Sequence, residues 1–248
     1  MEEIATQAFW LGLAKIIGVN VVLSGDNAVV IALAARSLPP RQQKQAILYG
    51  AGAAVVLRIV LTIFAVALLA LPWLKIAGGL LLFWIGIKLL VPGDGDENID
   101  ASDHLLAAVK TILIADLVMS LDNVIAVAAA AGGSLTLLII GLAISIPLVV
   151  FGATLLVTLM ERYPVIITIG AGLIGWVAGE MLVADPAIVE WFAGPGVPGI
   201  EHKAYLGDLS IELVAGAAGT LLVIALGHWL AKRPRADIPP EKANRPNS

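Results

Sequence analysis

The sequence predicts an all-α membrane protein: a seven-transmembrane-helix bundle with two inverted three-helix repeats plus a seventh helix. Three observations predict it: an unusually apolar composition, seven segments long enough to cross a bilayer, and a polar motif that occurs in both halves. The 248 residues are 59% hydrophobic and only 14% charged. A soluble domain has about 45–50% apolar and about 25% charged residues, so the apolar excess must face lipid.

Seven apolar segments qualify as membrane spans, since a helix needs about 20 apolar residues to cross the hydrocarbon core. They cover residues 8–35, 45–71, 73–91, 105–131, 134–159, 164–184 and 209–231. Proline and glycine separate most of them, at Pro39-Pro40, Pro72, Pro92-Gly93, Gly132-Gly133 and Pro164. The first segment lacks the basic n-region and short apolar core of a secretory signal, so it is predicted to remain as a span. Residues 1–231 are therefore predicted to form one transmembrane domain.

Two other segments are predicted to lie outside the membrane. Residues 185–208 are rich in Pro and Gly and mixed in polarity, which indicates a loop with an interfacial helix around 187–192. Residues 232–248 are rich in Pro and charge, which predicts a disordered cytoplasmic tail.

The basic residues predict the orientation in a cell (inner) membrane. Alternate loops place eleven Lys and Arg on one side and only two, Lys75 and Lys203, on the other. Cytoplasmic loops carry the excess of Lys and Arg, so the N-terminus is predicted outside and the C-terminus in the cytoplasm. The eleven are Arg36, Arg41, Lys44, Lys88, Lys110, Arg162, Lys232, Arg233, Arg235, Lys242 and Arg245.

An internal repeat relates spans 1–3 (repeat A, residues 8–91) to spans 4–6 (repeat B, residues 105–184), with the helix at 209–231 appended. Segment 20–27 matches segment 116–123 at an offset of 96 residues, and later matches follow at an offset of 92. Because each copy has an odd number of spans, the copies must cross the bilayer in opposite directions. Many secondary transporters have such repeats, with the substrate site near the midplane between them. The polar matches are Ser24 with Ser120, Asp26 with Asp122, and Asn27 with Asn123.

Carboxylates inside the spans indicate a cation site. An ionised Asp at the centre of a transmembrane helix costs at least about 2.5–3.5 kcal/mol, so such residues face the interior and meet a cation, a proton or one another. Hard divalent cations such as Mn²⁺, Mg²⁺ and Ca²⁺ prefer carboxylate, amide and water oxygens. The predicted ligands are Asp26, Asp116, Asp122, Asn20, Asn27 and Asn123, with Ser24 and Ser120 nearby.

Helix geometry bears on how these residues meet. Six residues separate Asn20 from Asp26 in the first span, which places them about 120° apart on an unbroken helix. Ser24-Gly25 favours a local break that would relieve this spacing, because Gly tolerates one. The fourth span has Ser120-Leu121 instead, where a break is less favoured.

Other features leave alternatives open. Arg58, inside the second span, could tether a buried Asp or bind the carboxylate of an amino-acid substrate. Glu180, near the outer end of the sixth span, is either a vestibule acid or an interfacial residue. The chain lacks cysteine, which excludes thiolate metal sites. It also lacks a phosphate-binding Gly-rich loop and an intramembrane nucleophile–base set, so neither ATP-driven pumping nor an enzyme is predicted.

The paired Ser-x-Asp-Asn segments 23–29 and 119–125 resemble those of the TerC family of integral membrane proteins, over about residues 8–231. Length and spacing are most similar to its YjbE-like branch of metal transporters, within the superfamily of LysE-type exporters. The resemblance implies export of divalent metal ions, chiefly manganese. In the family pattern an acidic residue precedes each Asp-Asn by six positions; here this is Asp116 in one copy but Asn20 in the other.

The leading hypothesis is therefore a secondary exporter of Mn²⁺ that exchanges it for protons at a midplane carboxylate and amide site. The alternatives are a LysE-type exporter of amino acids and a membrane scaffold that binds metal without transporting it. The predicted partners are the transported cation and the lipid bilayer, with a homodimer left open and no tightly bound cofactor. The net charge of −4 gives no support for a nucleic-acid partner.

Overall fold

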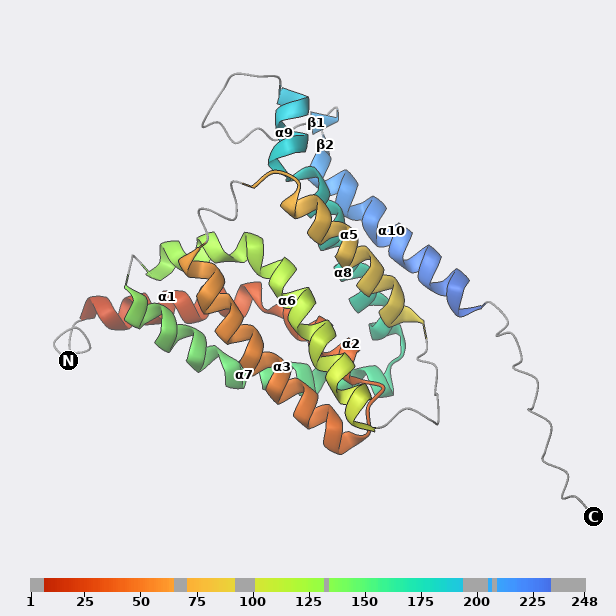
Figure 1. Cartoon of the computed structure of the whole chain (residues 1–248), viewed down its shortest axis with the longest axis horizontal. Coiled ribbons are helices and arrows are strands. Elements are labelled where there is room, and N and C mark those ends of the chain that lie inside the picture. The colour runs from red at the N-terminus through yellow and green to blue at the C-terminus, as the bar shows by residue number, and fades with distance from the viewer. Residues whose placement is uncertain are drawn as a thin grey trace, which may run out of the picture.

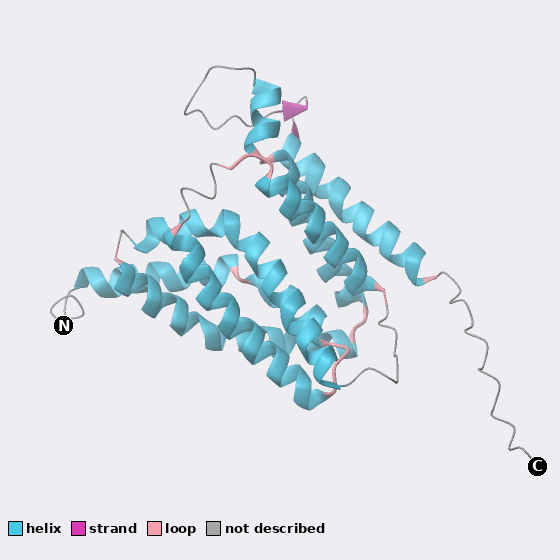
Figure 2. Cartoon of the chain, in the orientation of Figure 1, coloured by secondary structure: helices cyan, strands magenta, loops and turns pink. Residues whose placement is uncertain are grey.

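The computed structural model of the chain describes residues 7–64, 71–91, 101–131, 134–193, 205–206 and 209–232. This part is helical apart from one pair of two-residue antiparallel strands, β1 (Tyr205–Leu206) and β2 (Leu209–Ser210) (Figures 1 and 2). The helices are α1 (Gln7–Leu23), α2 (Gly25–Ala35), α3 (Pro40–Ile63), α5 (Leu74–Leu90), α6 (Ala101–Ala131), α7 (Leu135–Arg162), α8 (Val165–Val183), α9 (Pro186–Ala193) and α10 (Ile211–Ala231). The predicted interfacial helix corresponds to α9, and most of the predicted tail lies outside the described residues.

The first predicted span consists of two helices. α1 ends at Leu23, α2 begins at Gly25, and the two are bent by 50°. In a continuous helix the Asn27 N–H would bond to the Leu23 carbonyl; here it donates to the Asp26 carboxylate instead, at 2.8 Å. The break that Ser24-Gly25 favours is thus confirmed, whereas α6 continues without interruption through Ser120-Leu121.

Local sequence explains where other helices begin. α3 begins at Pro40, five residues before the predicted span, because proline at the first helical position has the right φ and needs no N–H partner. The Ser134 hydroxyl caps α7 by accepting a hydrogen bond from the Leu137 N–H at 3.3 Å. The Ser210 hydroxyl does the same for α10.

The protein crosses the membrane several times. Among the described residues, α3, α6, α7, α8 and α10 are long and apolar enough to span a bilayer, and the bent pair α1–α2 brings the number to six. α5 has 17 residues, which is the lower limit of about 17–25 residues for a transmembrane helix.

The spanning helices form two groups that meet along a seam (Figure 1). The large group contains α1, α2, α3, α6 and α7, and the small group contains α5, α8 and α10. Across the seam, α2 packs against α8 and α5 packs against α6. The seam therefore separates the third helix of each predicted repeat from the first two.

Helices at matching positions of the two predicted repeats lie antiparallel. In Figure 1, α1 and α7 begin at the left of the molecule, whereas α6 and α3 begin at the lower right and end at the left. The ends of α2, α5, α7 and α10 consequently gather with the beginnings of α3, α6 and α8, at the end of the bundle that carries most of the basic residues.

Glycine permits close packing in the small group. A Cβ atom at Gly175 of α8 would lie 2.6 Å from the Gly219 carbonyl oxygen of α10, and one at Gly79 of α5 would lie 2.9 Å from the Ala178 carbonyl oxygen of α8. Both distances are shorter than a side chain tolerates, so these backbones approach each other only because the residue is glycine.

A buried carboxylate joins the small group to the segment that follows α8. Asp185 is fully buried, and its oxygens accept hydrogen bonds from the backbone N–H groups of Trp73 (3.0 Å), Lys75 (3.0 Å), Ile76 (3.3 Å) and Ala187 (2.9 Å). Trp73 has a left-handed backbone, with φ of 71°. Burial raises the pKa of Asp185, but the four N–H donors outweigh it and lower the pKa below its ordinary value.

Candidate cation site

Arg58 of α3 lies in the centre of a buried polar network. Its side chain is 4% exposed, and every guanidinium nitrogen donates to a neighbouring helix. Nη2 bonds to Asp116 Oδ1 at 2.7 Å, and Nε bonds to Ser120 Oγ at 3.0 Å, both on α6. Nη1 bonds to Asn20 Oδ1 at 2.8 Å and lies 3.5 Å from Ser24 Oγ at the break between α1 and α2. The network therefore links three spans through one cation.

Both carboxylate oxygens of Asp116 take part in this network. Oδ1 forms the ion pair with Arg58, and Oδ2 accepts a hydrogen bond from Ser120 Oγ at 3.2 Å. The carboxylate is buried and next to a full positive charge, so it is stable inside the bilayer without a metal ion. The tether that the sequence left open for Arg58 is thus present, with Asp116 as its partner.

Ser145 of α7 belongs to the same network, although the sequence interpretation did not include it. Its side chain is fully buried. The hydroxyl accepts a short hydrogen bond from Asn20 Nδ2 and donates to the Leu142 carbonyl at 2.6 Å. The only sequence signal is a hydroxyl near the middle of an apolar span, two residues before Pro147.

The two Asp-Asn motifs converge at the break in the first span. The side-chain amides of Asn27 (α2) and Asn123 (α6) both point to the carbonyl oxygen of Leu23, at 3.5 and 3.4 Å. These hydrogen bonds are longer than the usual 2.7–3.2 Å and therefore weak. They nevertheless place both motifs beside one backbone oxygen at the end of α1.

Two oxygens at this convergence are suited to bind a cation. Asp26 is partly buried in the first turn of α2, where the helix N-terminus stabilises its negative charge. Asn27 is 3% exposed, and its Oδ1 atom has no hydrogen-bond partner within the described part of the chain. An unpaired buried amide oxygen costs roughly 1–3 kcal/mol, so a cation that accepted it as a ligand would recover that cost.

The predicted ligands thus fall into two neighbouring sets. Asn20, Ser24, Asp116 and Ser120 form the Arg58 network. Asn27 and Asn123 donate to the Leu23 carbonyl, and the Asp26 carboxylate accepts from the Asn27 N–H. The Asp26 carboxylate lies near enough to Arg58 and Asp116 for their charges to act on it. The backbone of Asp122 directly precedes Asn123 on α6, and its side chain lies outside the described atoms.

The structure does not gather these acids into one cluster. Among the described side chains, no group of three or more His, Cys, Asp or Glu is arranged to hold a metal ion. Glu180 is half-buried near the end of α8, in the small group of helices. The two motifs and the Leu23 carbonyl nevertheless offer carboxylate, amide and peptide oxygens, which are the ligand types of a hard cation.

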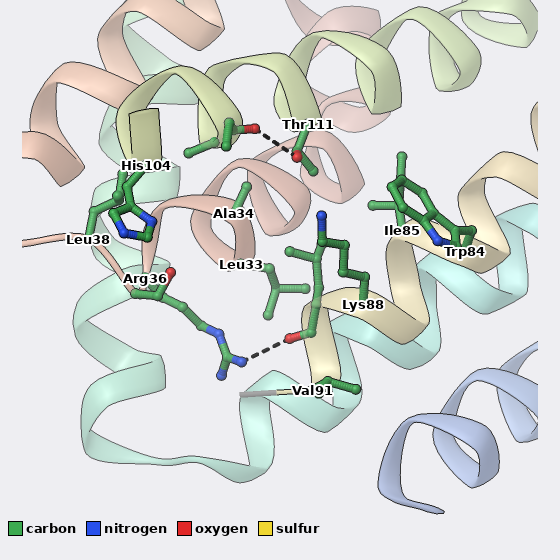
Figure 3. A pocket seen from close by; sticks show the side chains of 14 residues that line it. Leu33, Ala34, Arg36, Leu38, Trp84, Ile85, Lys88, Val91, His104 and Thr111 are labelled. Carbon is green, nitrogen blue, oxygen red and sulfur yellow. Dashed lines mark hydrogen bonds between the residues drawn. The ribbon is translucent and has the colours of Figure 1, made fainter. Parts of the chain in front are cut away.

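A pocket of about 300 Å³ opens at the basic end of the seam, between α2, α5 and α6 (Figure 3). Arg36, Lys88 and His104 line it. The Arg36 guanidinium donates to the Leu89 carbonyl at the end of α5 at 2.8 Å, and the Lys88 ammonium lies 5.0 Å from the centre of the Trp84 ring. Arg36 thus neutralises a carbonyl at the C-terminus of α5, and the positive charges of Arg36 and Lys88 would repel a free metal ion.

The geometry defines a multi-pass membrane protein with a charged polar network inside its helix bundle. The profile of the integral membrane protein TerC family matches residues 5–235, and the chain belongs to that family. It is thus an integral membrane protein and not an enzyme.

Several bacterial proteins are similar to the chain. It is 44% identical to the uncharacterized membrane protein YjbE of Bacillus subtilis over 188 residues, which is 76% of this chain and 86% of YjbE. It is 27% identical to YceF of the same organism over 190 residues, covering 73% and 74% of the two chains. The inner membrane protein YoaE of Escherichia coli is 30% identical over 145 residues, which is 50% of this chain and 28% of YoaE. No solved structure matches the chain.

Proposed function

We propose that the protein is a secondary transporter that exports divalent metal ions, chiefly Mn²⁺, across the inner membrane. The observation that carries the proposal is the convergence of the two Asp-Asn motifs on the Leu23 carbonyl. Membership of a family of integral membrane proteins supports it.

The proposed ligands come from both motifs. Asp26 and the unpaired oxygen of Asn27 would bind the ion from α2, and Asp122 and Asn123 would approach it from α6. The Leu23 carbonyl would add a peptide oxygen once the asparagine amides turn away. Two carboxylates neutralise a divalent cation, and oxygen ligands suit Mn²⁺ better than metals that prefer nitrogen or sulfur.

The arrangement of helices supports alternating access. We propose seven spans, with α5 as a short one, and an inverted relation between α1–α5 and α6–α8. The antiparallel pairs α1/α6, α3/α7 and α5/α8, and the equivalent contacts of α2 with α8 and of α6 with α5, agree with this relation. In such transporters the site lies between the repeats at the midplane. The end of the bundle rich in Lys and Arg would face the cytoplasm.

Exchange for protons would complete the cycle. When the cation leaves, it no longer balances the charges of Asp26 and Asp122, and protons are the smallest charges that can neutralise them inside the bilayer. The inward movement of protons would then drive the outward movement of the metal.

The proposal predicts that cells expressing the Asp26→Ala/Asp122→Ala variant accumulate manganese. We expect intracellular Mn²⁺, measured in cells loaded with the metal, to rise to the level of cells without the protein. Asp103→Ala is the matched control, because Asp103 is exposed in the first turn of α6 and far in sequence from both motifs. Export by the double variant equal to that of the unaltered protein would exclude the assignment.

The two alternatives receive less support. The Arg58 guanidinium already pairs with the Asp116 carboxylate and donates to Asn20 and Ser120, so an amino-acid carboxylate would have to compete with Asp116 for it. A scaffold that binds metal without transporting it is distinguished by flux: proteoliposomes containing a divalent-sensitive dye should respond to external Mn²⁺ only if the protein transports it.

A further inference from the structure

We propose that Arg58 and Asp116 form a charge-setting pair, which does not ligate the transported ion. The pair sets the net negative charge of the site so that one divalent cation balances it. This inference rests on the proposed function. It assigns Asp116 a role different from that of a metal ligand, and it makes Arg58 a determinant of the charge selectivity of transport.

The geometry of Asp116 argues against direct ligation. A carboxylate that binds a metal ion must present at least one oxygen to it, but Oδ1 of Asp116 is 2.7 Å from the Arg58 guanidinium and Oδ2 accepts from Ser120 at 3.2 Å. A charge-assisted bond of this length is among the strongest hydrogen bonds in proteins. A metal ion bound to either oxygen would lie beside the guanidinium, whose positive charge repels it.

The geometry of Arg58 argues that it stays in place. The side chain is buried on α3, and it is held by Asn20 from α1 and by Ser120 and Asp116 from α6. A guanidinium cannot lose its proton in a protein. If it left Asp116, both groups would be buried charges without a partner, which is strongly unfavourable.

The charges of the side chains at the site then indicate which charge of the bound ion they balance. Asp26, Asp116 and Asp122 carry three negative charges, and Arg58 removes one of them. Under the proposed function, two negative charges remain, those of the motif aspartates Asp26 and Asp122. A divalent cation makes the interior neutral. A monovalent cation would leave one charge unbalanced, and a trivalent cation would add one.

A cycle of three variants tests the pair. We would purify the full-length chain with Asp116→Asn, with Arg58→Gln and with both substitutions, and measure the Kd for Mn²⁺ from the electron paramagnetic resonance signal of the free ion. Asp116→Asn leaves Arg58 as an unbalanced positive charge near the ion, so we expect the Kd to rise about tenfold or more. Arg58→Gln leaves an extra negative charge, so the Kd should fall by a similar factor.

The double variant decides between a charge-setting pair and a ligand. It has lost the Asp116 carboxylate, but its net charge equals that of the unaltered protein. We therefore expect its Kd for Mn²⁺ to return to within about threefold of the original value. A double variant that binds as weakly as Asp116→Asn would show that Asp116 ligates the ion, and would overturn the proposal.

Selectivity provides a readout that a purely structural role would not change. Arg58→Gln should favour La³⁺ over Mn²⁺ by about tenfold more than the unaltered protein does, whereas Arg58→Lys keeps the charge and should keep the original preference. Equal shifts in both variants would overturn the proposal. Arg36→Gln is the matched control, since Arg36 contacts the Leu89 carbonyl outside the network.

Failure of the pair is separable from failure of the proposed function. If the single variants do not fold, the double variant still decides, because it contains no unpaired buried charge. If the unaltered protein binds Mn²⁺ no better than Asp26→Asn does, the cation site itself is absent, and both proposals fail. If Asp26→Asn abolishes binding but the cycle shows no compensation, only the charge-setting pair is wrong.

Discussion

Two buried, hydrogen-bonded carboxylates in the described part of the chain are stabilised in different ways. Asp116 lies beside a guanidinium, whereas Asp185 is surrounded by four backbone N–H groups from the beginnings of α5 and α9. The first arrangement brings a full positive charge into the bundle, and the second uses only peptide dipoles. The difference follows from position. Asp116 lies within a span, whereas Asp185 follows α8 and lies next to the N-termini of α5 and α9.

Asp185→Asn is expected to destabilise the protein by about 1–3 kcal/mol at neutral pH, because an amide cannot accept four hydrogen bonds from the same donors. The pKa of Asp185 is lowered in the folded protein, so the stabilisation is complete above the ordinary Asp pKa and is lost as the pH falls through the lower, folded value. Thermal unfolding in detergent should show a difference between the two proteins that shrinks below about pH 4.

Asp103→Asn serves as the control for this measurement, because it removes an exposed carboxylate of the same type. A difference in midpoint that stays constant down to the lowest pH would show that the charge of Asp185 contributes nothing.

The sequence predicts some of the contacts at the candidate site and misses others. The doubled motif predicts that Asn27 and Asn123 approach each other, and the structure brings both to the Leu23 carbonyl. Arg58 has two open roles in the sequence, because polarity alone does not reveal its partner. Ser145 and Asp185 were missed. Ser145 contacts Asn20, which lies 125 positions earlier in the chain, and Asp185 contacts the backbone of Trp73 and Lys75, about 110 positions earlier. No local sequence pattern encodes contacts over such separations.

At the scale of elements, the positions of proline and glycine predict where the helices begin and end, but not how the helices pack. The position of the first break follows from Ser24-Gly25, and α3 begins earlier than its apolar pattern because Pro40 can begin a helix among polar residues. The close approach of α8 to α10 is different. Glycine is common throughout the chain, and only the folded structure shows which glycines face another backbone.

Gly175→Ala is expected to separate α8 from α10 and destabilise the protein by about 1–3 kcal/mol, as overpacking does. Its Cβ atom would lie 2.6 Å from the Gly219 carbonyl oxygen, which belongs to the backbone and cannot rotate away. Gly52→Ala is the control: nothing lies within 4 Å of its Cβ position on α3, so it should leave stability unchanged or raise it by up to about 1 kcal/mol. Equal midpoints for both variants would refute the close contact.

At the scale of the whole molecule, the seam changes how the repeats are expected to move. The sequence indicates two copies that would rock against each other. The contacts instead join α5 and α8, one helix from each copy, to α10, and leave the remaining helices in the large group. The pieces that move as units would then be the two groups, and the helices that slide past each other would be α2 on α8 and α5 on α6.

A disulfide across the seam is expected to stop transport. The chain has no cysteine, so Val29→Cys/Gly170→Cys would form a single defined link between α2 and α8, where a Cβ atom at Gly170 would lie 2.7 Å from Val29 Cγ1. Oxidation should abolish Mn²⁺ flux into proteoliposomes, and reduction should restore it. Gly86→Cys/Ile174→Cys links α5 to α8 within the small group, where the corresponding distance is 3.3 Å, and should leave flux intact. Undiminished flux through fully linked Val29→Cys/Gly170→Cys would place the motion elsewhere.

The break between α1 and α2 has one more consequence. A helix that stops inside the bilayer leaves peptide oxygens that no later turn consumes, and the Leu23 carbonyl is one of them. Part of the chemistry of the interior is therefore encoded in backbone shape and not in the identity of a side chain. Leu23 could be exchanged for another apolar residue without removing that oxygen, so relatives that differ at this position can still offer the same ligand.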